Sequence, residues 1–279
     1  MNKAEELKQL VREKYSTIAG QDKEYNLASC CGATGCCGGD EVYNIMADDY
    51  TQLEGYVADA DLGLGCGLPT EHANLKEGQV VIDLGSGAGN DAFIARRIVG
   101  EKGKVIGIDF TDAMIDRART NAEKLGYNNV EFRMGDIERM PVTANVADVI
   151  VSNCVLNLVP NKKQVFAEIF RVLKPGGHFC ISDIVLNGEM PEKWKEIAEL
   201  YAGCVSGAVQ KWEYLQMIEE TGFRNLKLQK EKAIAIPEDI LLKYLSAEEV
   251  KAYLNGNVRI ESITVSATKP VCEPGSGCC

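Results

Sequence analysis

The chain has 279 residues, a net charge of −11 and 25% charged residues, which favours one large globular domain with an appended subdomain, or two domains. The acidic balance argues against a nucleic-acid binder and against attachment to an anionic membrane surface, because phosphate contacts need clustered Lys and Arg. No apolar run reaches the roughly 18 residues of a membrane span, and the N-terminus lacks the apolar core of a signal peptide, so we expect a cytoplasmic protein.

The N-terminal part of the chain mixes one amphipathic segment with glycine-rich loops. Helical spacing of apolar residues predicts a helix over residues 3–17. Residues 29–39 are a Gly/Cys loop that we expect to be mobile. A second helix is expected over 41–53, whereas segment 61–69 has too many glycines for regular structure.

From residue 78 onwards, short apolar runs alternate with helical patterns. This alternation predicts βαβ units and a mostly parallel sheet that is buried on both faces. Lys174-Pro-Gly-Gly177 predicts the end of a helix before the next strand. The expected strands are Val80–Leu84, Val105–Ile108, Val130–Met134, Ala147–Val151 and Phe179–Ile184, and the expected helices are 90–99, 112–125 and 162–173.

After residue 186 the pattern is mixed and predicts an α+β subdomain. Helices are expected over 191–203, 211–221 and 237–253, and strands over 224–232 and 258–268. We expect the chain to be organised as an N-terminal region with Cys loops, a doubly wound α/β domain, a C-terminal subdomain and a flexible Cys-rich tail, over residues 1–69, 70–188, 189–269 and 270–279.

A glycine-rich turn and two acidic strand ends indicate a cofactor site. Gly85, Gly87 and Gly89 follow a predicted strand and open a predicted helix, where glycine allows a tight turn and close backbone approach to a ligand. Asp109 ends the second strand, 24 residues beyond Gly85, where a carboxylate can accept hydrogen bonds from ribose hydroxyls. Asp136 ends the third strand. Each feature could also be a structural turn or cap, but the three occur in order at one edge of the sheet.

The spacing favours S-adenosylmethionine over a dinucleotide, because the third glycine comes one residue earlier than in the dinucleotide fingerprint. The order of these motifs, with Asn157-Leu-Val-Pro160 and Val172-Leu-Lys-Pro-Gly-Gly177, resembles the class I S-adenosylmethionine-dependent methyltransferases, a Rossmann-like fold, over about residues 70–185. That resemblance implies a cofactor site made of Asp83, Gly85, Ser86, Gly87, Gly89, Asp91, Asp109, Phe110, Met114, Asp136, Ile137, Glu138 and Asn153.

The eleven cysteines are the second unusual feature. Their number is odd and the expected compartment is reducing, so ligation, redox chemistry or simple burial are favoured over a disulfide framework. Cys154 falls after the fourth predicted strand, where such transferases receive substrate, and alone it could be a buried apolar residue. Cys66 and Cys204 lie in glycine-containing segments and do not form the Cys-x-x-Cys pairs of a zinc ribbon. The three could converge on one soft ion.

The segments Leu64-Gly-Cys-Gly-Leu-Pro69, Ser152-Asn-Cys-Val-Leu-Asn-Leu-Val-Pro160 and Gly203-Cys-Val-Ser-Gly-Ala208 resemble those of arsenite methyltransferases, and the resemblance extends over nearly the whole chain. It implies that Cys66, Cys154 and Cys204 bind trivalent arsenic. It also implies a fourth, redox-active cysteine near the N-terminus, for which we choose Cys31 from the set Cys30, Cys31, Cys36 and Cys37. The chain departs from some relatives at Leu64, where they carry Tyr.

The expected chemistry follows from these residue types. Trivalent arsenic favours thiolates, and three of them leave its lone pair free to attack the donor methyl group without a general base. Neither histidine, His72 or His178, belongs to the expected centre. The expected partners are arsenite or its thiol conjugates and an external thiol reductant of the glutathione or thioredoxin type, with a monomeric enzyme.

Two other functions remain open from the sequence. One is a class I methyltransferase for another small molecule, with structural cysteines; the other is a thiol-rich metalloid-binding protein without catalysis. Cys180 lies in a predicted inner strand and is expected in the core. Cys272, Cys278 and Cys279 are expected to be tail thiols that collect soft metals or have no specific role.

Overall fold

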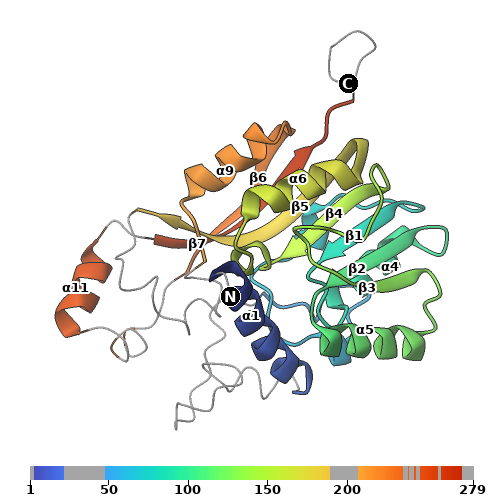
Figure 1. Cartoon of the computed structure of the whole chain (residues 1–279), viewed down its shortest axis with the longest axis horizontal. Helices are drawn as coiled ribbons and strands as arrows, with labels where there is room; N and C mark the ends of the chain where they lie inside the picture. Colours follow the sequence, from blue (N-terminus) through green and yellow to red (C-terminus); the bar gives the residue numbers. More distant parts are fainter. Residues whose placement is uncertain are drawn as a thin grey trace.

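The computed structural model describes residues 3–21, 48–188, 207–234, 246–256 and 259–271, together with 238 and 242. Its centre is a seven-stranded sheet of order β3-β2-β1-β4-β5-β7-β6 (Figure 1). The strands are β1 (Val80–Leu84), β2 (Lys104–Asp109), β3 (Val130–Met134), β4 (Ala147–Asn153), β5 (Leu173–Asn187), β6 (Arg224–Ile234) and β7 (Arg259–Thr268). The first five are parallel, and β7 and β6 are antiparallel additions.

Helices cover both faces of the sheet, as the continuous apolar runs of the inner strands predict. The helices are α1 (Lys3–Ala19), α3 (Pro69–His72), α4 (Asn90–Val99), α5 (Asp112–Leu125), α6 (Lys162–Val172), α9 (Lys211–Glu220) and α11 (Ala247–Asn255), with short 3-10 turns η1 (Ala58–Ala60) and η2 (Leu156–Leu158). No helix in the described part of the chain is long and apolar enough to cross a bilayer.

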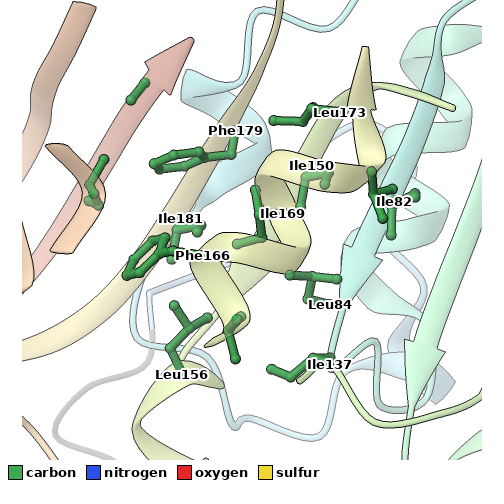
Figure 2. Close-up of a cluster of buried hydrophobic side chains, with 14 of the residues drawn as sticks. Ile82, Leu84, Ile137, Ile150, Leu156, Phe166, Ile169, Leu173, Phe179 and Ile181 are labelled. Carbon is green, nitrogen blue, oxygen red and sulfur yellow. The ribbon is translucent and has the colours of Figure 1, made fainter. Parts of the chain in front are cut away.

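Alternate residues of each strand pack on opposite faces. Ile82 of β1 packs with Phe166 and Ile169 of α6 on one face (Figure 2). The neighbouring Val81 packs on the other face with Phe93 of α4. Each fully buried aliphatic side chain of this kind contributes about 1.5–3 kcal/mol to folding. The core therefore holds the strand ends, and the loops that follow them, at fixed positions.

The expected βαβ elements are confirmed in their type and order, with three differences in extent. Strand β5 begins at Leu173, not Phe179, because Gly176 and Gly177 already exchange backbone hydrogen bonds with Lys269 after β7. The residues of the expected helix 41–53 that the structure describes, 48–53, are not helical. Their side chains are used elsewhere: Asp48 pairs with lysines of β6, and Asp49 accepts the Thr51 N–H.

The third difference is a break in the expected helix 237–253: Glu238 and Leu242 are helical, Ser246 is not, and α11 begins at Ala247. Ser246 and Glu249 bond reciprocally as a capping box, which sets this start. The expected helix 191–203, the Cys loop at 29–39 and the tail cysteines lie outside the described residues.

The order of the strands creates a switch point between the parallel neighbours β1 and β4. After β1 the chain continues to β2 on one side of the pair, and after β4 it continues to β5 on the other side. Ligands of doubly wound sheets bind beside such a point, at the carboxyl ends of the strands. The glycine turn after β1 and Cys154 after β4 both lie there.

Candidate active site

A pocket lies at the carboxyl ends of β1, β2, β3 and β4, and it gathers most of the residues expected to bind the cofactor. All of them except Gly89 and Glu138 line it. Gly89 has a different role, because a Cβ there would lie 2.7 Å from the ring of Phe93 and the residue has a φ of 101°. It is needed for the turn and for packing of the ring behind the pocket.

The glycine turn shapes one wall of the pocket. Gly85 has a φ of 65°, and a Cβ on it would lie 2.4 Å from Val155, the residue after Cys154. The close approach brings the β1 turn against the β4 turn. Gly87 has a φ of 50°, and its position faces open space except for Met114 at 4.0 Å. A ligand can therefore approach the backbone at Gly87 without meeting a side chain.

Asp109 holds this wall in place. Its carboxylate accepts the Gly87 N–H at 3.0 Å and the Thr111 N–H at 2.8 Å. Burial raises the pKa of Asp109, although these bonds favour the charged form. The residue therefore orients the glycine turn as well as facing the pocket, a second role that the sequence analysis did not predict.

The pocket contains polar atoms that fit a cationic ligand with hydroxyl and amino groups. In the part of the chain that the structure describes, Asp83 Oδ2, Ser86 Oγ and Asn90 Oδ1 are buried without a hydrogen-bond partner. Burial and the nearby charges of Asp91 and Asp109 raise the pKa of Asp83 well above its usual range. S-adenosylmethionine carries a sulfonium, an ammonium and two ribose hydroxyls, so a bound donor would neutralise the acids and satisfy these orphaned atoms.

The N-terminal helix closes the far end of the pocket. Lys8 of α1 donates to Asp136 at 2.5 Å and also pairs with Glu138, and Lys8 and Tyr15 both line the cavity. Burial opposes the charge on Lys8, but the two carboxylates raise its pKa overall. The sequence predicts an amphipathic helix here, yet it carries no signal that this helix covers a site more than a hundred residues away.

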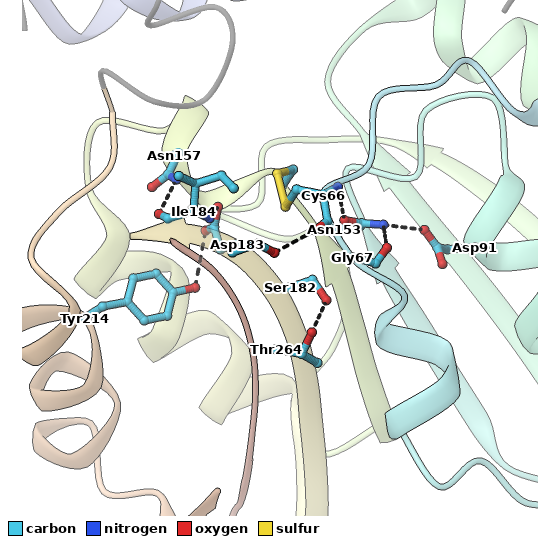
Figure 3. Close-up of a disulfide and its surroundings, with 12 residues drawn as sticks. Cys66, Gly67, Asp91, Asn153, Asn157, Ser182, Asp183, Ile184, Tyr214 and Thr264 are labelled. Carbon is cyan, nitrogen blue, oxygen red and sulfur yellow. Dashed lines mark hydrogen bonds between the residues drawn. A yellow bond between two sulfur atoms is a disulfide. The ribbon is translucent and has the colours of Figure 1, made fainter. Parts of the chain in front are cut away.

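Two of the three expected arsenic ligands lie together beside the pocket. Cys66 and Cys154, 88 residues apart, are joined in a disulfide with their Cα atoms 5.8 Å apart (Figure 3). The sequence analysis expects thiolates at these positions, and the structure differs because the Cα separation falls within the range that a disulfide spans. Reduction is therefore a condition for binding a soft ion there.

The third expected ligand, Cys204, and the expected redox residue, Cys31, lie outside the described residues. A group of three or more metal-binding side chains does not occur among the residues that are described. The nearest described residues after Cys204 are informative: Lys162 donates to the Gly207 carbonyl at 2.8 Å, and Ala208 packs against the cluster that contains Cys66 and Cys154.

The loop that carries Cys66 is fixed through its backbone. The Cys66 N–H donates to Asn153 Oδ1 at 3.0 Å, and its carbonyl accepts from Ser262 Oγ at 2.6 Å. Gly67 lies so close to β5 that a Cβ would be 2.5 Å from Ser182 Oγ. These contacts with β4, β5 and β7 explain how a glycine-rich loop can present a thiol at a defined position.

Cys154 also has an unusual backbone. Its φ is 58°, its N–H donates to the Ser182 carbonyl at 2.8 Å, and its side chain is almost completely buried. A residue with a Cβ rarely adopts this conformation, and such strain is found mostly where the side chain has a function. Cys180, in contrast, lies in β5 with a thiol whose pKa burial raises to about 12, which confirms it as a core residue.

Sequence reasoning missed Tyr50 and Asp61. Tyr50 is buried, and its hydroxyl oxygen lies 3.0 Å from both the Gly67 carbonyl oxygen and Asp91 Oδ2. Tyr50 and Asp61 both line the pocket. Burial raises the pKa of Asp91 to about 6, although hydrogen bonds from Tyr50 and Asn153 oppose the shift. Tyr50 lies in the stretch 41–53, for which the sequence predicts a helix, and nothing in that pattern indicates a contact with Gly67 or Asp91.

Comparison with known proteins gives consistent results. A family model described as a methyltransferase domain matches residues 75–222. The arsenite methyltransferase of Halobacterium salinarum is 39% identical over 95% of this chain and 67% of its own length, and that of Mus musculus is 36% identical over 77% and 56%. The crystal structure of an arsenic (III) S-adenosylmethionine methyltransferase from Chlamydomonas reinhardtii superimposes with a TM-score of 0.62 at 33% identity, covering 76% of this chain and 68% of that one.

The relatives are longer than this chain. It spans between 44% and 67% of the length of the curated arsenite methyltransferases that it matches. The match to the Halobacterium salinarum protein covers 95% of this chain and therefore includes both Cys66 and Cys154.

Proposed function

The chain belongs to the arsenite methyltransferases, and from that premise we propose that it transfers methyl groups from S-adenosylmethionine to trivalent arsenic held by its own cysteine thiolates. The observation that carries the proposal is the meeting of Cys66 and Cys154 in one place, with Cys154 lining the pocket that fits the donor. Two sulfurs and a bound methyl donor would therefore share one site.

The third thiolate in this proposal is Cys204. Ala208 packs on the cluster of Cys66 and Cys154, and four residues of extended chain span at most about 14 Å. Chain length alone therefore allows Cys204 to reach the other two sulfurs, which supports its choice as the third ligand. Three thiolates would hold arsenic as a pyramid with its lone pair directed away from them.

The residues of the site would align the reactants. The donor supplies an electrophilic methyl carbon on a sulfonium sulfur. Asp83 and Asp91 offer negative charge to its cationic end, and Asp109 keeps the glycine turn in place. The backbone bonds of Cys66 fix the acceptor side, so the rate advantage would come mainly from proximity and alignment.

The transfer needs no base among these residues. The arsenic lone pair becomes the As–C bond, while the C–S bond electrons stay on the departing thioether. Arsenic is thereby formally oxidised by two electrons. Two external thiols, which become a disulfide, must return it to the trivalent state, and the same reductant keeps Cys66 and Cys154 reduced. We infer a reductant of the glutathione or thioredoxin type, a reducing compartment such as the cytoplasm, and a monomer.

The test is turnover by purified protein with arsenite, S-adenosylmethionine and excess thiol, followed by mass-coupled chromatography. We expect methylarsenicals from the unchanged chain and none above background from Cys66→Ala, Cys154→Ala or Cys204→Ala. Cys180→Ala is the matched control, because that thiol is equally buried but lies in the core, and it should retain turnover. If the reduced protein binds the donor yet forms no methylarsenical, the proposal is wrong.

A further inference from the structure

Tyr50 is a buried polar side chain at the centre of the site, and the proposed function assigns it no role. The residue is 4% exposed, and its Oη lies 3.0 Å from the Gly67 carbonyl oxygen and 3.0 Å from Asp91 Oδ2. The Asn153 amide also donates to Tyr50 Oη. One phenol thus contacts the Cys66 loop, helix α4 and strand β4.

The hydrogens in this cluster are matched to its acceptors. The Tyr50 hydroxyl supplies one and the Asn153 amide supplies two. The acceptors are the Gly67 carbonyl, Asp91 Oδ2 and Tyr50 Oη itself. Because Asn153 reaches Gly67 at 2.7 Å but Asp91 only at 3.4 Å, the economical arrangement gives the phenol hydrogen to Asp91 and the amide hydrogens to Gly67 and Tyr50.

The same amide connects this cluster to the thiol. Asn153 Oδ1 accepts the Cys66 N–H at 3.0 Å, so the orientation of the amide sets the Cys66 backbone on one side and the Tyr50 phenol on the other. A rotated amide would present a hydrogen to the Cys66 N–H and lose the bond. The phenol therefore helps to decide which way Asn153 points.

We propose that Tyr50 is a positioning residue that orients the Asp91 carboxylate toward the methyl donor and, through Asn153 and Gly67, fixes the Cys66 loop to the same unit. The part concerning Asp91 depends only on donor binding, and the part concerning Cys66 rests on the proposed function.

The electrostatics around Asp91 make this role measurable. Burial raises its pKa to about 6, and the bond from Tyr50 favours the ionised form. Without the phenol, Asp91 would hold its proton to a higher pH. A cationic donor is bound better by the ionised acid, so donor affinity should fall as the pH falls through this pKa. The groups that face Asp91 are Tyr50, Asp61, Thr70, Asp83 and Asn153.

The experiment compares Tyr50→Phe with Tyr214→Phe. Tyr214 is the matched control, because it is also fully buried and donates to a carboxylate, Asp183, at 3.3 Å, but it belongs to α9 and does not line the pocket. The dissociation constant of S-adenosylmethionine is measured by calorimetry between pH 5 and 8, and the arsenite dissociation constant of the reduced protein is measured at pH 7.5.

In the unchanged chain and in Tyr214→Phe, donor affinity should fall with a midpoint near pH 6. In Tyr50→Phe we expect that midpoint to move up by about one pH unit, the size of one lost hydrogen bond to a charged group. Compared with the unchanged chain, Tyr50→Phe should bind arsenite about tenfold more weakly, whereas Tyr214→Phe should bind it with unchanged affinity. In Asp91→Asn the step in donor affinity near pH 6 should disappear, which gives a second readout if Tyr50→Phe folds poorly.

Two outcomes overturn the inference: a midpoint in Tyr50→Phe equal to that in Tyr214→Phe, or an Asp91→Asn protein that keeps the step in donor affinity near pH 6. Failure of the proposed function would look different. In that case no variant binds arsenite, while the shift of the donor midpoint still reports on Tyr50 and Asp91.

Discussion

The contact of Gly67 with strand β5 allows one sharp prediction about the Cys66 loop. A Cβ at position 67 would lie 2.5 Å from Ser182 Oγ, 2.6 Å from Ser182 Cβ and 3.4 Å from Thr264 Oγ1. Gly67 does not have a positive φ, so alanine is compatible with the backbone and the effect of Gly67→Ala is steric. Ser182 is completely buried and bonded to Thr264 at 2.8 Å, so it has no room to turn away.

The magnitude follows from the overlap. Carbon atoms pack at about 3.5–4 Å, so the loop must retreat from β5 by about 1 Å. Overpacking of this kind costs about 1–3 kcal/mol of folding free energy. The same displacement moves Cys66 away from Cys154, so we expect arsenite to bind the reduced Gly67→Ala protein at least about tenfold more weakly, equivalent to about 1.4 kcal/mol.

Equilibrium dialysis with arsenic quantified by mass spectrometry measures this affinity, and urea unfolding measures stability. Gly20→Ala is the control, because its Cβ would meet only the Thr17 carbonyl at 3.5 Å. Ser182→Gly removes both nearest colliding atoms, so the double variant should recover arsenite affinity. Unchanged affinity and stability in Gly67→Ala would refute the reasoning that β5 positions the Cys66 loop.

Three further predictions concern the pocket and the core. Asp109→Ala should weaken S-adenosylmethionine binding by about 1.5–3 kcal/mol in calorimetry, because it removes the acceptor that holds the Gly87 N–H; an unchanged dissociation constant contradicts the assignment. Lys8→Met should speed donor release by up to about fivefold in stopped-flow measurements at low salt, since α1 loses its partly exposed ion pairs with Asp136 and Glu138. Asp183→Asn should stabilise the protein by about 2–3 kcal/mol more at pH 8 than at pH 5 in urea unfolding. Burial raises the folded-state pKa of Asp183 to about 7, so its ionised form destabilises the fold increasingly as the pH rises from about 4 to above 7. Equal effects at both pH values would contradict this sign.

The local elements of the sheet were predictable because each one has its own signal. The apolar run Val80–Leu84 and the helical pattern from 112 to 125 match β1 and α5 at both ends. Strand pairing was harder to predict from the sequence. Strands β5 and β7 pair although about 80 residues separate them, and no local pattern indicates that contact. The expected helix at 41–53 failed where Asp48 and Tyr50 bind distant residues, which outweighs local helical spacing.

The site, like the fold, was only partly predictable from the sequence. The glycine turn and Asp109 follow from strand ends and spacing, and both lie in the pocket. Cys66 and Cys154 were linked only by resemblance to a family, since 88 intervening residues carry no information about their distance. Tyr50 and Lys8 reach the pocket from segments whose sequence gives no sign of the contact, because the partners lie on other elements.

The claim that thiols hold the nucleophile is tested most directly by arsenic X-ray absorption spectroscopy on the reduced protein with one equivalent of arsenite. We expect three sulfur neighbours on arsenic in the unchanged chain and in Cys180→Ala, and two in Cys204→Ser with an oxygen in the third position. A spectrum with oxygen neighbours alone, or one unaffected by loss of Cys66 and Cys154 together, would contradict the account.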